Sequence, residues 1–287
     1  MPIGARCAAV FVALAWGINM IVAKLSTAEI PPLMLTALRF ALVAVLLFPF
    51  CRPKRDQLPW LIALSATLGT GHFGLLFLGL SLSEAGTGAI LVQLGAPIAV
   101  FLGVLLLRER IGISAIIGLM LATAGLVMLA CGPNTPPPLP FVILLVSAVS
   151  WAVSNTIVRM APPIRPLEIN AVSALFSVPQ LLGMSLMIEG NPLEYVGHIG
   201  FVGIMGVLYT ALVSSVLAYG IWYGLIQTYG VASVINYSLL TPVFATAFGI
   251  VLLDEPANPS KIVSGLSIVL GASISMCFSG SRERPVR

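Results

Sequence analysis

Two stretches of the chain decide the fold: residues 16–32 read WGINMIVAKLSTAEIPP, and residues 151–167 read WAVSNTIVRMAPPIRPL. In each stretch a tryptophan is followed eight residues later by a basic residue, and prolines then open the next apolar segment. The two tryptophans are 135 residues apart, whereas the later prolines Pro97 and Pro242 are 145 residues apart. The chain therefore contains an internal repeat whose second copy carries an insertion.

The composition places most of the chain in lipid. Hydrophobic residues make up 59% of its 287 residues, charged residues only 8%, and the mean hydropathy is +1.06. A soluble domain has about 25% charged residues, so no soluble fold of this size would cover so much apolar surface. The net charge of +4 lies in short loops rather than on one face, which excludes a nucleic-acid-binding protein.

The apolar segments predict an all-α integral membrane protein with ten spanning helices. Five segments fall in each copy, and a unit that crosses a bilayer an odd number of times ends on the opposite side. The two copies are therefore expected to be inverted repeats, which is the architecture of secondary transporters. The expected spans are residues 6–25, 31–51, 60–80, 86–107, 113–131, 140–160, 168–188, 199–226, 231–253 and 261–279.

Lysine and arginine predict the orientation, because they accumulate in cytoplasmic loops. With the N-terminus inside, most of the 14 basic residues fall on the inner side, Lys261 falls outside, and Lys24 lies near the outer edge. Both termini are therefore expected in the cytoplasm. The first segment is expected to be a retained helix rather than a signal peptide, because Trp16 and Lys24 have counterparts in the second half.

A proline-rich connector, residues 133–138, separates a first repeat at 1–132 from a second repeat at 139–287. The fifth and tenth segments carry small residues at every fourth position, which let helix backbones approach closely in lipid. The pattern fits packing within a monomer, or the seam of a homodimer. These small residues are Ser114, Gly118, Ala122, Ser267, Gly271 and Ser275.

Pro97 and Pro242 fall in the middle of the fourth and ninth segments. A proline inside a helix removes a hydrogen bond and frees carbonyl groups, which in lipid need a partner or a wet cavity. Equivalent kinks in both repeats predict a role in gating. Glu109 and Glu255 follow the same two segments, where they are expected to be either gate latches, one at each face, or solvated loop charges.

Polar and aromatic side chains in the first, third, fourth, sixth, eighth and ninth segments fall at a similar depth. Each one alone is explained by a hydrogen bond between helices. As a set they predict the lining of a cavity for a small polar or zwitterionic solute with an apolar part. The expected lining is Trp16, Asn19, His72, Gln93, Trp151, Ser154, Asn155, Ser215, Tyr219, Trp222, Asn236 and Tyr237.

Few groups in the spans can carry charge. No Asp or Glu falls near the middle of a segment, and carboxylates at depth are the usual proton or sodium carriers, so weak or absent ion coupling is expected. Arg39, eight residues into the second segment, must face protein or water, and either bonds to carbonyl groups or attracts a carboxylate-bearing solute. The sequence has no metal-ligand spacing, and no metal or cofactor is expected.

These residues together resemble the drug/metabolite transporter superfamily, specifically its ten-helix members with two EamA repeats. The resemblance covers essentially the whole chain. It implies cytoplasmic termini, a basket formed by helices 1–4 and 6–9, helices 5 and 10 set apart, and alternating access. It rests on Ala15-Trp16-Gly17-Ile18-Asn19 with Lys24, on Leu38-Arg39-Phe40, on Pro97 with Glu109, and on Trp151, Tyr219, Trp222, Pro242 and Glu255.

Similar family members export amino acids or related metabolites, and the aromatic-amino-acid exporters are the nearest comparison. We therefore expect a secondary transporter of small metabolites, foremost amino acids, in the bacterial inner membrane, with the solute and lipid as its partners.

An exchanger of phosphorylated sugars or nucleotide-sugars would need several basic residues in the cavity, and proton-coupled drug efflux would need a carboxylate in the first helix. A membrane enzyme would need a nucleophile–base pair or metal ligands, which the separated His72 and His198 do not supply. A non-transporting scaffold would have no use for paired prolines.

Overall fold

The structure is a computed structural model of the 287-residue chain. The residues that it describes are 1–108, 112–130, 137–191, 193–197, 199–257, 259, 263, 264, 266, 267, 269–271 and 274. Glu109, expected to be a gate latch, lies outside these residues. So do most of the tenth expected span and residues 133–136 of the connector.

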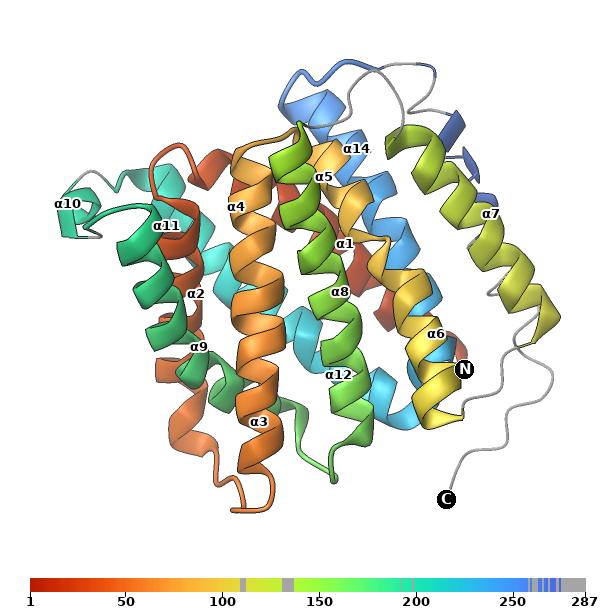
Figure 1. Ribbon diagram of the computed structural model, residues 1–287, viewed down its shortest axis with the longest axis horizontal. Coiled ribbons are helices and arrows are strands. Elements are labelled where there is room, and N and C mark those ends of the chain that lie inside the picture. The colour runs from red at the N-terminus through yellow and green to blue at the C-terminus, as the bar shows by residue number, and fades with distance from the viewer. Residues whose placement is uncertain are drawn as a thin grey trace.

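The described residues of the first repeat form helices throughout, with short connections (Figure 1). Two of the spans run through several consecutive helical pieces. In chain order the elements are α1 (Ile3–Ser26), α2 (Pro32–Leu47) with the 3₁₀ turn η1 (Phe48–Phe50), α3 (Leu58–Leu64), η2 (Ser65–Gly74), α4 (Leu75–Ser81), α5 (Ala85–Val92), α6 (Gly95–Leu107) and α7 (Ile113–Ala130).

The second repeat follows the same order, with one additional short helix, α10, between its second and third spans. Its elements are α8 (Pro138–Met160), α9 (Pro166–Ile188), α10 (Leu193–Val196), α11 (Phe201–Leu208), η3 (Tyr209–Tyr219), α12 (Gly220–Tyr229), α13 (Val231–Val234), η4 (Ile235–Leu240) and α14 (Thr241–Leu252).

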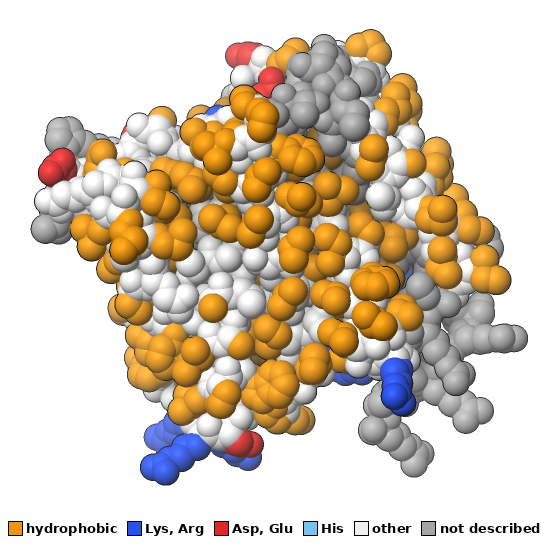
Figure 2. Space-filling model, in the orientation of Figure 1, with side chains coloured by type: hydrophobic (Ala, Val, Ile, Leu, Met, Phe, Trp, Pro, Cys, Tyr) orange, Lys and Arg blue, Asp and Glu red, His pale blue; other side chains and the backbone are white. Residues whose placement is uncertain are grey.

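Among the described residues, eight helices are long and apolar enough to cross a membrane, and they coincide with expected spans one to four and six to nine. Helix α7 lies where the fifth was expected and is an apolar helix of 18 residues. Hydrophobic side chains cover the flank of the bundle in Figure 2. Lys and Arg gather at one end, here called the basic end, and Asp and Glu mostly at the opposite, acidic end (Figure 2).

Pro97 and Pro242 do not lie inside continuous helices, which corrects the expectation of mid-helix kinks. The fourth span is broken between α5 and α6, and the ninth passes through the 3₁₀ segment η4 before α14. Each proline occupies the first turn of the second half of its span. A proline is tolerated there because the first N–H groups of a helix have no partner within it. The helix break therefore precedes the proline, at Gln93–Leu94 and at η4.

The third span of each repeat contains a π-helical stretch, which the sequence did not indicate. It is η2, of 10 residues, in the first repeat and η3, of 11 residues, in the second. π-Helices are rare in proteins, and those that occur are often found at functional sites. A methyl group on Gly69 would lie only 1.8 Å from Ser177 Oγ on α9, so the glycine allows η2 and α9 to approach closely.

The two repeats pack against each other through equivalent elements. Helix α2 packs on α9, which is the second span of each repeat. Helix α1 packs on α14, and α8 packs on α6, so the first span of each repeat lies against the second half of the other repeat's broken helix. These reciprocal contacts are what a twofold relationship between the repeats produces.

The small residues of the fifth and tenth segments meet within one chain. A methyl group on Gly271 would lie 2.5 Å from the carbonyl oxygen of Gly118 and 3.0 Å from Cβ of Ala122. Close packing of these segments inside a single molecule therefore accounts for the small residues at 118, 122 and 271. Helix α7 stands at the edge of the bundle (Figure 1).

Candidate functional site

A cavity lies where the two repeats meet. It is narrow, with room for on the order of two or three water molecules. The described residues around it include no Lys, Arg, Asp or Glu, and both repeats contribute. The lining is Trp16, Asn19, Met20, His72, Phe73, Leu76, Ala89, Val92, Gln93, Trp151, Tyr219 and Thr241.

Four aromatic side chains form a cluster at the cavity: Trp16, Trp151, Tyr219 and Trp222. The ring of Trp16 lies 4.6 Å from that of Tyr219 and 4.9 Å from that of Trp222, measured between centroids. Trp16 and Trp151, which occupy equivalent positions in the two repeats, meet edge to face at 6.3 Å. Such a cluster offers π faces to an ammonium group or to an aromatic ring of a solute.

The indole N–H groups of this cluster differ in their partners. Trp222 Nε1 donates to Asn155 Oδ1 at 2.8 Å, and Trp151 Nε1 donates to the Tyr219 hydroxyl at 3.2 Å. Trp16 Nε1 is buried and has no partner. The same is true of two other polar atoms of the lining, Asn19 Oδ1 and Thr241 Oγ1. One donor, one acceptor and one hydroxyl are thus left for a bound molecule, because buried polar groups are normally hydrogen-bonded.

The breaks in the fourth and ninth spans meet at this point. Gln93, in the break between α5 and α6, donates from its side-chain amide to the carbonyl oxygen of Ser238 in η4. The two residues stand at the same place in their repeats, four positions before Pro97 and Pro242. The Ser238 carbonyl oxygen, which also accepts the backbone N–H of Thr241, therefore takes a second donor from the other broken span. As with Trp16 and Trp151, equivalent residues contact each other where the repeats meet.

His72 is held by Ser147 of α8. Its Nδ1 lies 3.0 Å from Ser147 Oγ and 3.2 Å from the Ser147 carbonyl oxygen, while the Ser147 hydroxyl donates to the His72 carbonyl oxygen at 2.9 Å. The serine hydroxyl hydrogen is engaged and the second partner is a carbonyl, so the network assigns the proton to Nδ1. His72 is thus a hydrogen-bonded packing residue that also lines the cavity.

The structure brings half of the expected lining residues to the cavity and buries the others outside its lining. Trp16, Asn19, His72, Gln93, Trp151 and Tyr219 line the cavity. The remaining residues are buried but lie outside the lining: Ser154, Asn155, Ser215, Trp222, Asn236 and Tyr237. Of these, Trp222 and Asn155 support the cluster, because the ring of Trp222 stacks on Trp151 at 6.1 Å and its N–H bonds to Asn155.

Six lining residues were not expected from the sequence: Met20, Phe73, Leu76, Ala89, Val92 and Thr241. Five of them are apolar and resemble any other residue of a spanning helix. Met20 and Phe73 directly follow the expected residues Asn19 and His72, so only the rotation of each helix distinguishes them. The sequence held one usable signal, because Thr241 directly precedes Pro242 at the break of the ninth span.

Carboxylates tie the two repeats together at the acidic end. Glu255, three residues after the end of α14, accepts hydrogen bonds from the backbone N–H groups of Ala85 at 2.9 Å and Gly86 at 3.4 Å, at the start of α5. The N-terminus of a helix carries partial positive charge and unpaired N–H groups, so it is a suitable site for an anion. The gate-latch hypothesis for Glu255 therefore has a defined partner.

Two further carboxylates do the same, and the sequence did not reveal them. Glu29 accepts from the N–H groups of Gly200 at 3.0 Å and Gly203 at 2.6 Å, at the start of α11. Glu189 accepts from those of Leu33 at 2.6 Å and Met34 at 3.1 Å, at the start of α2. In all three cases the carboxylate belongs to one repeat and the helix to the other.

Lys24 and Arg159, the basic residues of the two decisive stretches, have equivalent roles. Lys24 Nζ donates to the carbonyl oxygens of Leu80 at 3.0 Å and Ser83 at 2.7 Å, beside the end of α4. Arg159 Nη1 donates to the carbonyl oxygen of Gln227 in α12 at 2.8 Å. In each repeat the last basic residue of the first span thus satisfies carbonyl groups at the end of the third, where a cation is favoured.

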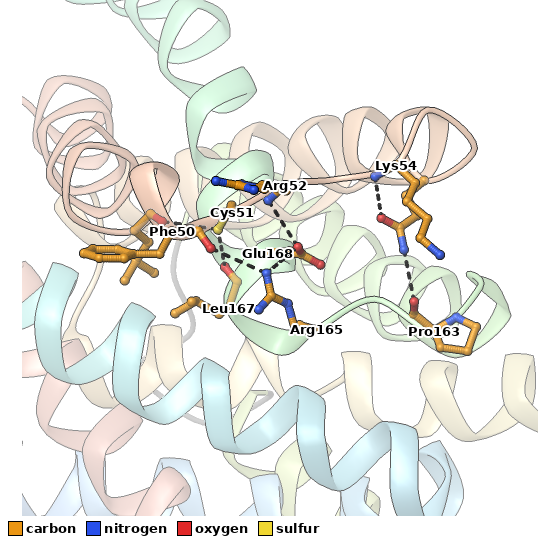
Figure 3. A network of polar contacts seen from close by, with 10 residues as sticks. Phe50, Cys51, Arg52, Lys54, Pro163, Arg165, Leu167 and Glu168 are labelled. Atoms are coloured by element: carbon orange, nitrogen blue, oxygen red, sulfur yellow. Dashed lines mark hydrogen bonds and ion pairs between the residues drawn. The ribbon is translucent and has the colours of Figure 1, made fainter.

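At the basic end, the loop after α2 contacts the segment before α9 (Figure 3). The Glu168 carboxylate accepts from Arg165 at 2.7 Å and from the backbone N–H of Arg52 at 3.3 Å. The side-chain amide of Gln57 donates to the carbonyl oxygen of Pro163 at 3.1 Å. Contacts between the repeats therefore close the bundle at both ends, with the narrow cavity between them.

A helical membrane bundle of two repeats, with broken helices meeting at a central cavity, belongs to the class of secondary transporters. The chain belongs to the EamA-like transporter family, whose sequence profile matches residues 4–131 and again residues 139–277. It therefore contains two EamA repeats of the drug/metabolite transporter superfamily, and it is a multi-pass protein of the bacterial inner membrane.

Named relatives agree with this assignment. The chain is 30% identical over 279 residues to a protein of Salmonella typhimurium and to one of Escherichia coli, each called "Probable amino-acid metabolite efflux pump", with 93% of both chains covered in each case. It is 24% identical to an uncharacterized transporter of Bacillus subtilis, with 95% of this chain and 96% of the relative covered.

A solved crystal structure has the same fold. It superposes with a TM-score of 0.74 and covers 96% of this chain and 98% of its own, at 18% sequence identity. At that identity the similarity describes the fold alone.

Proposed function

We propose that this protein moves amino acids or closely related small metabolites across the membrane by alternating access. The observation that carries the proposal is the central cavity, where Trp16 meets Trp151 and Gln93 meets Ser238. A site built from equivalent parts of two repeats stays in place while each repeat rocks about it, and this is how repeat-built transporters expose a site to either side.

The chemistry of the lining supports a small zwitterionic solute. Aromatic faces suit an ammonium group or an apolar side chain, and the unpartnered atoms of Trp16, Asn19 and Thr241 supply one donor, one acceptor and one hydroxyl. A phosphorylated sugar would need several cations there, and the described lining includes none. The relatives named as amino-acid metabolite efflux pumps support the same solute class.

The contacts at the two ends define what must change during transport. The cavity is too narrow for an amino acid, so the aromatic side chains around it must separate when a solute binds. In the proposed topology of ten spans, the basic end faces the cytoplasm. Opening outward then breaks the carboxylate contacts at the acidic end, and opening inward breaks those around Glu168.

The proposed transport is not coupled to an ion gradient. Proton- and sodium-driven carriers use carboxylates within the membrane, and the described cavity lining has none. The solute therefore moves down its own concentration gradient.

Uptake by proteoliposomes tests the proposal. Each proteinogenic amino acid is offered in turn, with and without a pH gradient, to vesicles that contain the full-length protein. We expect uptake of a subset, unchanged by the gradient, and its loss in Gln93→Leu. Gln180→Leu, which removes an amide of α9 away from the cavity, should retain uptake. Uptake of no amino acid together with exchange of phosphate esters would replace the proposal with the sugar-phosphate alternative, and strong substrate-driven proton flux would contradict uncoupled transport.

A further inference from the structure

A buried positive charge lies one layer behind the cavity. Arg39 is the middle residue of the second span and is fully buried, with 0% of its surface exposed. Its Nε donates to Ser215 Oγ at 2.6 Å and its Nη2 to Ser214 Oγ at 3.3 Å, and both hydroxyls belong to η3. These partners correct the expectation that Arg39 bonds to carbonyl groups. Both partners are neutral, so neither balances the charge.

The guanidinium has no anionic counterpart among the described residues. Its electrostatic neighbours are two tyrosines, Tyr219 and Tyr223, with no Asp or Glu beside it. Its remaining nitrogen, Nη1, is buried without a partner. Burying an arginine in a membrane protein is costly unless an anion pairs with it, and among the described residues no anion offsets that cost for Arg39. The fold therefore maintains a charge for which it provides no partner of its own.

One other unpartnered donor lies near Arg39. The Tyr223 hydroxyl is buried and without a hydrogen-bond partner. Tyr223 is an electrostatic neighbour of Arg39, and its ring contacts that of Tyr219 with 5.3 Å between centroids. Donors without acceptors around a cation form the arrangement that a carboxylate satisfies, because a carboxylate offers two acceptor oxygens and one negative charge.

One aromatic ring separates this group from the cavity. The Arg39 guanidinium lies over the face of Phe73, 3.9 Å from the ring centroid, and Phe73 also lines the cavity. Phe73 in turn contacts Tyr219 of the aromatic cluster, with 5.4 Å between centroids. Displacement of the Phe73 ring would join the two spaces, and the cavity must widen in any case to hold a solute.

We propose that Arg39, with the donor of Tyr223, is the site that takes the carboxylate of the transported solute. The inference rests on the proposed function and makes it more specific. It assigns the carboxylate to the Arg39 side of Phe73, and the ammonium and side chain to the aromatic cluster around Trp16. The solute thus supplies the counter-ion that the protein lacks, and molecules without a negative charge are rejected.

Binding of a matched set of ligands tests this assignment. Full-length protein in nanodiscs is titrated with phenylalanine, its carboxamide and 3-phenylpropionate, and tryptophan fluorescence reports binding because Trp16 and Trp151 line the cavity and Trp222 contacts both. The carboxamide retains the ammonium and the ring and lacks only the charge. We expect the dissociation constant of phenylalanine to be lower than that of the carboxamide by on the order of ten- to a hundredfold in the wild-type protein. This ratio is the contribution expected of a charge-assisted hydrogen-bonded pair.

Variants locate the origin of this preference. Arg39→Gln should abolish it by weakening phenylalanine alone, and Arg39→Lys should restore part of it. Should Arg39→Gln fail to fold, Tyr223→Phe removes one donor without a change of shape and should lower the preference by about threefold.

The outcomes separate the two proposals. Equal binding of phenylalanine and its carboxamide, or a preference unchanged in both Arg39→Gln and Tyr223→Phe, would overturn the carboxylate site and leave amino-acid transport standing. Binding of 3-phenylpropionate alone, lost in Arg39→Gln, would support the carboxylate site and count against amino acids as the solute. If no carboxylate in the series binds, the site is overturned as well.

Discussion

Replacement of Glu255 by glutamine should shift the protein toward a conformation that is open at the acidic end. The carboxylate of Glu255 joins α14 to the first N–H groups of α5, across the two repeats. Hydrogen bonds to a charged group contribute about 1.5–3 kcal/mol, roughly twice as much as neutral ones. The bond to Ala85 at 2.9 Å is well formed, whereas that to Gly86 at 3.4 Å is at the limit of a hydrogen bond.

Glutamine retains the shape and one acceptor but loses the charge, so the closed state should lose about 1–2 kcal/mol, which is a factor of about 5–30 in the equilibrium. Spin labels at positions 82 and 252, both exposed residues near this end, report the distance between the two repeats there. Pulsed electron paramagnetic resonance in nanodiscs, on a background without the native cysteines, should show a larger population at long distance in Glu255→Gln.

Asp56→Asn, which removes an exposed carboxylate from the loop before α3 at the opposite end, serves as the control and should leave the distribution unchanged. If the distribution in Glu255→Gln matches that of the wild type, or if Asp56→Asn shifts it equally, Glu255 does not hold the acidic end closed. The reasoning that connects helix N-termini with gating would then be wrong.

Two further predictions use matched pairs. Trp222→Phe should lower the free energy of unfolding by about 1–3 kcal/mol more than Trp16→Phe does. The replacement of Trp222 leaves Asn155 Oδ1 buried without its donor, whereas Trp16 Nε1 has no partner to lose. Thermal melting in detergent compares the two variants, and equal melting temperatures would contradict the prediction. Gly69→Ala should reduce the yield of folded protein, because its Cβ would lie 1.8 Å from a serine Oγ of α9, whereas Gly183→Ala, with nothing within 4 Å, should not. Size-exclusion chromatography of both variants decides the matter, and normal yield of Gly69→Ala would show that η2 can move away from α9.

The positions of the helices along the chain could be predicted closely from the sequence. Helix α9 was expected at 168–188 and is found at Pro166–Ile188, and the fourth span was expected at 86–107 and is found from Ala85 to Leu107. Lipid requires a span to be predominantly apolar and its backbone groups to be hydrogen-bonded within the protein. Hydropathy is therefore a direct measure of where a span begins and ends.

The polar residues at depth could also be selected from the sequence, but their roles could not. Gln93 and Asn155 look alike in the sequence, yet Gln93 lines the cavity and Asn155 supports Trp222 from behind. Of the two expectations for Arg39, bonding to carbonyl groups was wrong, because its partners are serines of η3 on another span. Which face of a helix meets which neighbour depends on its rotation about its own axis, and a nearly uniform apolar surface carries no signal for that angle.

By itself the sequence determined that the chain lies in a membrane, that it is built from two repeats, and where eight of the ten expected spans fall, because these properties follow from hydropathy and from counting. Only the tertiary structure decided that Glu29, Glu189 and Glu255 each cap a helix of the opposite repeat, that the third spans contain π-helices, and that Gln93 meets Ser238. The carboxylate caps and the Gln93–Ser238 hydrogen bond are contacts between residues more than a hundred positions apart. Their free energy arises only when the two repeats pack together, and for that reason no local stretch of sequence records them.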